Sequence, residues 1–202
     1  AGEAWDVALQ IAALREQARQ QIRQAVNGSE QDQVIFCGPG ATAAINKLID
    51  ILGLRLPHDL AQRYQLQQYI PSQERPVVFI GPYEHHSNEL PWRESIADVE
   101  SIPLTLDGQI CLDTLAEKLQ KYADRPLIIG SFSAGSNVTG IRSDVLAVTR
   151  LLKQYGALAF WDYAAAAPYV GIDMNAASPP DAVFISPHKF VGGPGPPGLL
   201  IA

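Results

Sequence analysis

Two side chains, Lys189 and Asp162, could work as a chemical pair. Lys189 closes the run Ser-Pro-His-Lys at 186–189, where a primary amine could hold an aldehyde as an imine. Asp162 directly follows an apolar run at 157–161, where a carboxylate could keep a pyridine nitrogen protonated. Pyridoxal phosphate needs both an amine and an acid of this kind, so the pair predicts that cofactor.

Strands must position these two side chains. The short apolar runs at 157–161 and 182–185 predict buried strands, and each ends directly before a polar residue, Asp162 or Ser186. Open α/β sheets bind their ligands at the carboxyl ends of their strands. We therefore expect Asp162 and the lysine segment to lie at the same edge of one sheet.

Along the rest of the chain, predicted strands alternate with helix-like stretches. Apolar runs predict strands at 34–37, 77–80, 98–102, 127–131, 157–161, 182–185 and 198–201, and helix-like stretches lie at 4–26, 41–53, 113–122 and 143–155. Asp113 and Ser143 are candidate helix caps. The polar stretch from 56 to 75 is expected to be a surface excursion with a helix near 58–69. This alternation predicts a mainly parallel sheet covered by helices.

A glycine-rich segment at 37–44 lies between a predicted strand and a predicted helix. Its backbone amides and the helix N-terminus could bind a phosphate. Gly38, Gly40 and Ala43 also fit the spacing of a dinucleotide-binding loop, which makes a Rossmann-type enzyme the main alternative. About 20 residues further on, however, that alternative requires an acidic residue after a second strand, and the chain is polar and irregular there. A purely structural turn is the third interpretation.

Four segments in order resemble the class V aminotransferase and cysteine desulfurase family: Glu-His-His-Ser-Asn at 84–88, Ser-Asn-Val-Thr-Gly at 136–140, 161–168 and 186–189. The resemblance runs from about residue 30 to the end. It implies a three-layer α/β/α sandwich with a seven-stranded, mostly parallel sheet whose last strand is antiparallel. Residues 1–202 would be the pyridoxal phosphate-binding large domain of fold type I, a fragment without the small C-terminal domain, from a protein that forms a homodimer.

The resemblance also implies where the cofactor phosphate binds. Gly40, Ala41 and Thr42 would hold it through the glycine-rich loop, with the Ser186 hydroxyl and an imidazole nitrogen of His188 completing the site. Ser186 and His188 flank the proposed Schiff-base lysine, Lys189, which suits a single compact cofactor site.

Two further residues take roles by resemblance. His85 would stack on the cofactor ring, although the neighbouring His86 takes that role if the register is shifted by one residue. Asn137 would lie near the phenolic oxygen of the cofactor and the carboxylate of the substrate. One position departs from the family: members commonly place a Gln three residues after the aspartate, where this chain has Ala165. An alanine cannot donate a hydrogen bond to the phenolic oxygen.

Composition limits the other classes of function. A net charge of −6 and a pI near 5.1 argue against a general nucleic-acid or anionic-membrane binder. Arg15, Arg19 and Arg23 recur on one helix face, but intervening polar residues favour a solvated surface. The sequence contains no apolar run of the roughly 20 residues that span a bilayer. Cys37 and Cys111 show no spacing typical of disulfides or metal sites, so no metal is expected and a cytoplasmic setting is favoured.

The sequence therefore predicts a pyridoxal phosphate-dependent enzyme acting on an amino acid, either a transferase or a lyase. A substrate amine would displace Lys189, whose freed amine would then act as general base at the substrate α-carbon. Family desulfurases carry a nucleophilic cysteine later in the chain, and Cys37 and Cys111 are poor substitutes. A dinucleotide-binding enzyme and a noncatalytic homologue acting as a scaffold remain the alternatives.

Overall fold

The computed structural model describes residues 2–193 and 195–202, with side chains from residue 6 onward. Within these residues, seven strands form one sheet in the order β1-β7-β6-β5-β4-β2-β3. The strands are β1 (Val34–Pro39), β2 (Val77–Ile80), β3 (Asp98–Ser101), β4 (Ile128–Ser133), β5 (Leu158–Asp162), β6 (Ala182–Ile185) and β7 (Pro197–Ile201). Only β7 runs against its neighbours, β1 and β6. The predicted sheet, including its antiparallel last strand, is confirmed.

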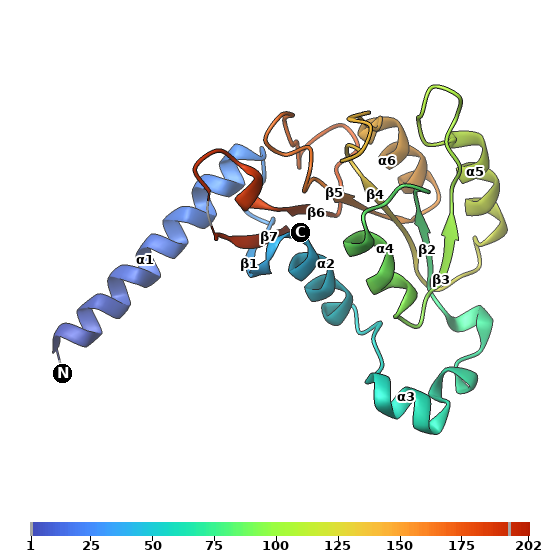
Figure 1. The fold of residues 1–202 in the computed structure, drawn as a ribbon, viewed down its shortest axis with the longest axis horizontal. Coiled ribbons are helices and arrows are strands. Elements are labelled where there is room, and N and C mark those ends of the chain that lie inside the picture. Colours follow the sequence, from blue (N-terminus) through green and yellow to red (C-terminus); the bar gives the residue numbers. More distant parts are fainter. Residues whose placement is uncertain (1, 194) are drawn as a thin grey trace.

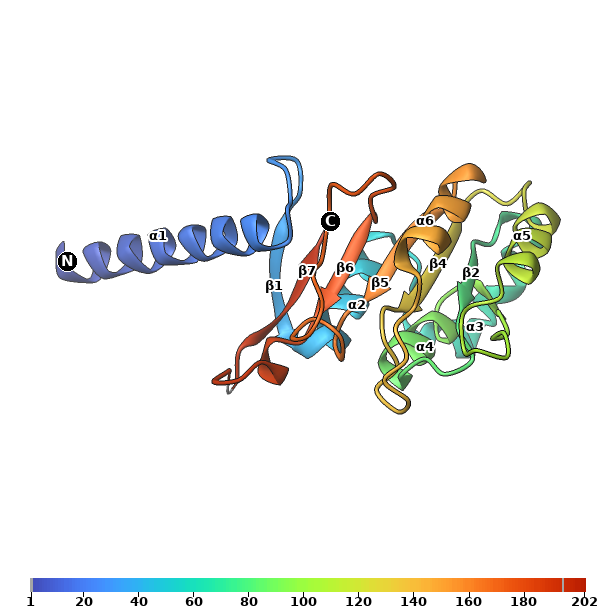
Figure 2. The same cartoon turned by 90° about the horizontal axis from the view of Figure 1, so that it is seen from above.

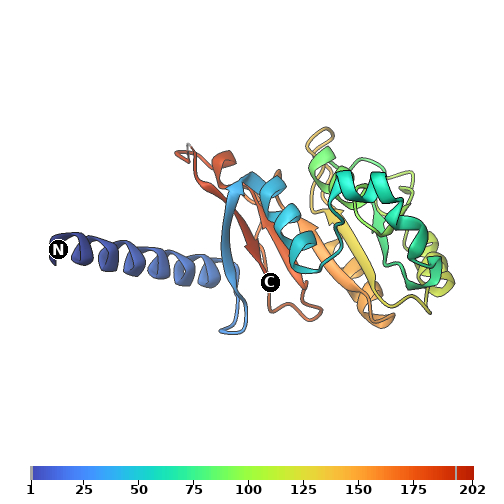
Figure 3. The same ribbon diagram turned by 90° about the horizontal axis from the view of Figure 1, so that it is seen from below.

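Helices cover both faces of this sheet. The α-helices of the described residues are α1 (Gly2–Ala25), α2 (Gly40–Ile51), α3 (His58–Tyr64), α4 (His86–Arg93), α5 (Leu112–Lys121) and α6 (Val145–Gln154). Of these, α2, α4, α5 and α6 pack on the sheet. Figure 2 shows α5 and α6 over one face, and Figure 3 shows α2 on the other. Alternate residues of each strand enter one of two apolar clusters, so Val77 and Phe79 pack with α5 and α6 while Val78 and Ile80 pack with α2 and α4. The three-layer α/β/α architecture is thereby confirmed.

Three details differ from the sequence-based expectations. The helix expected near 58–69 is broken at Gln65, whose φ of 49° is left-handed, so α3 is followed by a short 3-10 turn. Helix α4 was not expected, because it is short and contains Pro91. The helix caps shift by one or two residues: Asp144, not Ser143, accepts from the Ala147 amide, and Cys111 precedes α5 in place of Asp113.

Helix α1 projects from the body of the molecule (Figure 1). Its last turns contact β1, where the Arg19 guanidinium donates to the Val34 carbonyl at 3.2 Å and lies over the Phe36 ring. Apolar residues nearer its N-terminus, including Ile11 and Leu14, are exposed. Among the described residues, no helix combines the length and the apolar character needed to cross a membrane.

Candidate active site

A cavity of about 250 Å³ opens at the carboxyl edge of the parallel strands. This volume is slightly below the roughly 300–1,000 Å³ typical of small-molecule pockets. All nine residues predicted for the cofactor site line it, together with the alanine at the unusual position: Gly40, Ala41, Thr42, His85, Asn137, Asp162, Ser186, His188, Lys189 and Ala165. The structure therefore brings together side chains from five separate segments of the chain.

Asp162 lies at the end of the central strand β5 and is only 5% exposed. Its carboxylate accepts one hydrogen bond, from the Ala164 amide at 2.8 Å. Burial raises the pKa of Asp162 to about 6, although the Ala164 amide and the positive charge of Lys189 oppose this shift. A buried carboxylate with so little compensation favours a cationic or N–H partner in the cavity.

The glycine-rich loop and the lysine segment supply groups that suit an anion. Gly40 links β1 to α2, and the first residues of α2, whose amides have no partner within the helix, line the cavity. The Ala41 amide donates to the Ser186 hydroxyl at 2.8 Å. This contact joins the glycine-rich loop to the segment that carries the lysine, although the two are distant in sequence. Backbone amides, a hydroxyl and the His188 imidazole together form a set of donors suited to a phosphate.

Gly40 has to be a glycine in this arrangement. Its φ is +62°, and a Cβ added there would lie 2.9 Å from His188 Cε1 and 3.1 Å from Ser186 Oγ. A side chain would therefore enter the anion cradle as well as strain the backbone.

We expect Gly40→Ala to weaken cofactor binding at least tenfold, measured by titrating the protein with pyridoxal phosphate and following its visible absorbance. Gly53→Ala is a matched control, because Gly53 also has a positive φ, +68°, but a Cβ there meets nothing within 4 Å. Equal affinity in the two variants would show that Gly40 does not face the bound phosphate.

Lys189 ends a 3-10 turn, Pro187–Lys189, which follows β6 directly. Its backbone amide donates to the Ser186 carbonyl at 3.0 Å, which fixes the turn at the strand end. Both His188 and Lys189 are solvent-exposed while lining the cavity. The ammonium group is thus free to move toward a ligand, whereas Asp162, on the neighbouring strand, is held in place.

The structure separates the two adjacent histidines. His85 lines the cavity, and its Nδ1 accepts from the Ser87 amide at 3.2 Å and lies 2.7 Å from the Ser87 hydroxyl. His86 instead lines a neighbouring groove. Asn137 reaches the cavity from a loop after β4, in a turn where the Ser136 hydroxyl accepts from two backbone amides. The geometry favours His85 over His86 as the ring-stacking candidate.

Ser133 and Glu84 belong to this region and were missed as site residues. Ser133 ends β4 and pairs in register with Asp162. The strand predicted at 127–131 stopped two residues short, so the serine looked like part of a loop. The Glu84 carboxylate accepts from the Ser133 amide at 3.0 Å and from its hydroxyl at 2.6 Å. Burial raises the pKa of Glu84, and the nearby charge of Asp162 adds to that shift.

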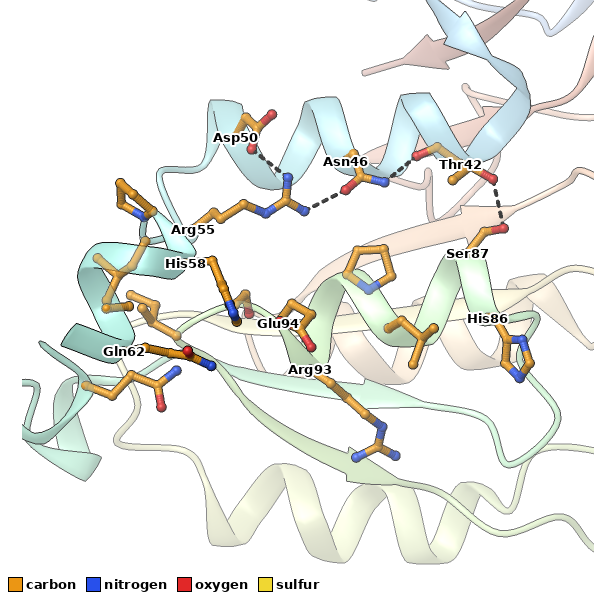
Figure 4. Close-up of a pocket in the computed structure, with 18 of the residues that line it drawn as sticks. Thr42, Asn46, Asp50, Arg55, His58, Gln62, His86, Ser87, Arg93 and Glu94 are labelled. Carbon is orange, nitrogen blue, oxygen red and sulfur yellow. Dashed lines mark hydrogen bonds and ion pairs between the residues drawn. The ribbon is translucent and has the colours of Figure 1, made fainter. Parts of the chain in front are cut away.

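A larger groove of about 1,220 Å³ lies beside the cavity, between α2, α3 and α4 (Figure 4). Thr42 and Ser87 line both spaces, and their hydroxyl groups are hydrogen-bonded at 2.8 Å. The basic side chains in the groove already have partners, since Arg55 binds Asp50 and Asn46 and Arg93 binds Glu89. We assign no ligand to this groove.

The two cysteines stay outside the cavity. Burial raises the pKa of the Cys37 thiol, which is half-buried in β1. Cys111 precedes α5, and a hydrogen bond from Thr114 lowers its pKa. Neither lies among the residues that line the cavity. Across the described residues, no cluster of three His, Cys, Asp or Glu side chains is arranged to hold a metal ion.

Comparison with known proteins identifies the family of this chain. A sequence model of the class V aminotransferases matches residues 3–201. The chain belongs to this family. The dinucleotide alternative is not supported, because β1, the strand before the glycine-rich loop, is an edge strand paired antiparallel with β7, whereas a dinucleotide-binding loop lies within a parallel βαβ unit.

Two relatives named as probable cysteine desulfurases match most of this chain. A probable cysteine desulfurase of Streptomyces coelicolor is 29% identical over 193 residues, which cover 94% of this chain and 42% of that protein. A second, from Halalkalibacterium halodurans, is 29% identical over 184 residues, 89% of this chain and 40% of that protein. The chain thus spans less than half the length of these relatives.

Solved structures show the same fold. A NifS-like protein from Rickettsia africae superposes with a TM-score of 0.72 at 20% identity, covering 95% of this chain and 47% of that protein. An alanine–glyoxylate aminotransferase from Nostoc gives a TM-score of 0.67 at 20% identity, covering 93% of this chain and 44% of that chain. The same fold therefore occurs in proteins that are named for different activities, so the fold by itself does not select a reaction.

Proposed function

We propose that this chain forms the cofactor-binding part of a pyridoxal phosphate-dependent enzyme that acts on an amino acid, with residues 1–202 as its large domain. One observation carries the proposal: Lys189, Asp162 and an amide-lined anion cradle line a single small cavity. An amine, a buried acid and a phosphate site are the three features that this cofactor requires.

The residues present fit the cofactor in two respects. Asp162 is buried with a raised pKa and a single backbone donor, which suits a partner that brings an N–H group to the carboxylate. In addition, the absence of a side chain at Gly40 keeps the approach to Ser186 and His188 clear, because a Cβ there would crowd both residues. When bound, pyridoxal phosphate supplies an aldehyde for the amine and a ring that withdraws electrons from the substrate α-carbon.

Each side chain then has a distinct task. The Lys189 amine would hold the cofactor through its aldehyde, and the same amine would act as general base toward the substrate α-carbon. Asp162 keeps the pyridine nitrogen protonated. Ala41, Thr42, Ser186 and His188 bind the phosphate, His85 packs on the ring, and Asn137 contacts the phenolic oxygen and the substrate carboxylate.

The class of reaction is the finer part of the proposal. The named relatives favour a cysteine desulfurase-like activity, with transamination as the second outcome of the same proton removal. Neither Cys37 nor Cys111 lies in the cavity, so a sulfur-accepting thiol would have to come from elsewhere in the full-length protein. We further propose a cytoplasmic homodimer that binds neither nucleic acid nor membranes.

The direct test is to add pyridoxal phosphate to the full-length protein and record its absorbance. A cofactor joined to a lysine as an imine absorbs visible light, whereas the protein without cofactor does not. Formation of alanine from cysteine, with release of sulfide when a thiol reductant is added, would then identify desulfuration, and formation of a keto acid with transfer of the amine would identify transamination. A protein that binds no cofactor would support the noncatalytic alternative instead.

Ala165 allows a test of how the chain sets the chemistry of the bound cofactor. It lines the cavity, at the position where the family resemblance implies a Gln. We expect Ala165→Gln to donate to the phenolic oxygen and so to move the pH midpoint of the cofactor absorbance by up to about 1 unit, which corresponds to roughly 1.4 kcal/mol. Ala166→Gln is no suitable control, because Ala166 is buried in the core. Identical midpoints with full cofactor occupancy would mean that residue 165 does not reach the ring.

A further inference from the structure

Glu84 contacts three segments of the chain next to the candidate site. It lies between β2 and α4, directly before His85. Its carboxylate accepts from the Ser133 amide and hydroxyl, at 3.0 and 2.6 Å, from the Gly81 amide at 3.3 Å and from the Asn88 side-chain amide at 2.9 Å. One carboxylate therefore joins the end of β2, the end of β4 and the first turn of α4.

The partner Asn88 extends this contact into the core. Asn88 is fully buried, and its Nδ2 also donates to the Ser131 carbonyl at 3.2 Å. Its Oδ1 accepts from the Ser131 hydroxyl at 2.7 Å, while the Trp92 indole donates to the same hydroxyl at 3.1 Å. Because every polar group here has a partner, the network is rigid and holds α4 in one position against β4.

His85 depends on this first turn of α4. Its ring nitrogen accepts from the Ser87 amide, and its backbone carbonyl accepts from the Asn88 amide at 2.7 Å. Ser87 in turn reaches Thr42 on the glycine-rich loop at 2.8 Å. The position of the His85 ring thus depends on the position of the first turn of α4. The Glu84 carboxylate attaches that turn to β4.

We infer that Glu84 is a positioning residue, whose carboxylate fixes the start of α4 against Ser133 and so holds the His85 ring at the wall of the cavity. The effect of Glu84 on the cofactor rests on the proposed function, but its effect on the His85 imidazole does not. Glu84 itself contacts Ser133, Gly81 and Asn88 and takes no part in bond making.

The experiment compares Glu84→Ala and Glu84→Gln in the full-length protein. Glu89→Gln is the matched control, because Glu89 lies in the same helix and pairs on the surface with Arg93. Two signals are recorded: the NMR resonance of the His85 ring without cofactor, and the visible circular dichroism of bound pyridoxal phosphate, which reports how rigidly the ring is held. Thermal unfolding is measured in parallel.

We expect Glu84→Ala to shift or broaden the His85 resonance and to reduce the circular dichroism band at least threefold, while Glu89→Gln matches the wild type. Glu84→Gln should give a smaller change of the same kind, because it keeps one accepting oxygen, while the NH2 group that replaces the other oxygen cannot accept from Asn88. If the alanine variant does not fold, the glutamine variant tests the inference. A lowered melting temperature with an unchanged His85 resonance would overturn the inference. If the wild type binds no cofactor, the proposed function fails, while the His85 resonance still tests the positioning role.

Discussion

Borohydride reduction of the cofactor-loaded, full-length protein is expected to leave pyridoxal phosphate attached to Lys189 and to no other lysine. Reduction converts the C=N bond between the lysine nitrogen and the cofactor carbon into a stable amine, so peptide mapping can locate it. Lys189 is suited to this bond because it is exposed at the mouth of the cavity and its turn is fixed to the end of β6. The label should appear in the peptide that contains the 186–189 segment.

Lys153 serves as the internal control, because it is ion-paired with Asp181 and lies in the last turn of α6. Lys189→Ala should abolish both the label and turnover, a loss of several orders of magnitude, because it removes the covalent attachment and the general base together. Label on Lys153 in a fully loaded protein, or an active alanine variant, would contradict the central assignment.

A second large effect is expected for Asp162→Asn. The amide still fits the strand end but no longer favours the protonated pyridine nitrogen. The full-length variant should therefore keep its cofactor and lose more than tenfold in the rate of α-proton removal, about 1.4 kcal/mol in barrier. Exchange of the substrate α-proton with deuterated solvent measures this step directly. Asp181→Asn, a carboxylate away from the cavity, is the control, and near-normal exchange in Asp162→Asn would remove that residue from its proposed role.

The same substitution should change how stability depends on pH in the protein without cofactor. Burial raises the pKa of Asp162 from 3.8 to about 6, so between these values the folded state binds more protons than the unfolded state. The free energy of unfolding must then fall as pH rises through this range, by roughly 3 kcal/mol at most. Urea unfolding at pH 4.5 and 8 should show a smaller fall for Asp162→Asn. The stability of this variant should still depend on pH to some extent, because the pKa of Glu84 is raised as well.

Much of the fold was predictable because buried strands are short apolar runs that contrast with their surroundings. The strands at 77–80 and 182–185 match their predicted limits, since Pro76 and Gly81 flank the first and Asp181 and Ser186 flank the second. Helix α4 was not predictable in this way. It is short, contains Pro91 and carries few apolar residues, and its stability comes from tertiary contacts such as that of Trp92 with Phe160.

The candidate site was predictable where residue chemistry and family resemblance agreed, as for Lys189 and Asp162. The partners that hold those residues were not, because their importance arises from contacts across the fold. Ser133 lies next to Asp162 through the register of β4 and β5, and Glu84 reaches Ser133 across a separation of 49 positions in sequence. No local pattern in the sequence marks either contact.

The antiparallel strand β7 has a consequence for how the protein folds during synthesis. Strand β1 joins the sheet only through β7, and Gly198 lies so close to Gly40 that an added Cβ would be 1.9 Å from the Gly40 carbonyl oxygen. The glycine-rich loop leaves the ribosome early, whereas its neighbouring strand emerges more than 150 residues later. Because contacts between distant segments form slowly, the anion cradle should be among the last parts of this region to become ordered. A nascent chain that has not yet released β7 should therefore have no affinity for the cofactor.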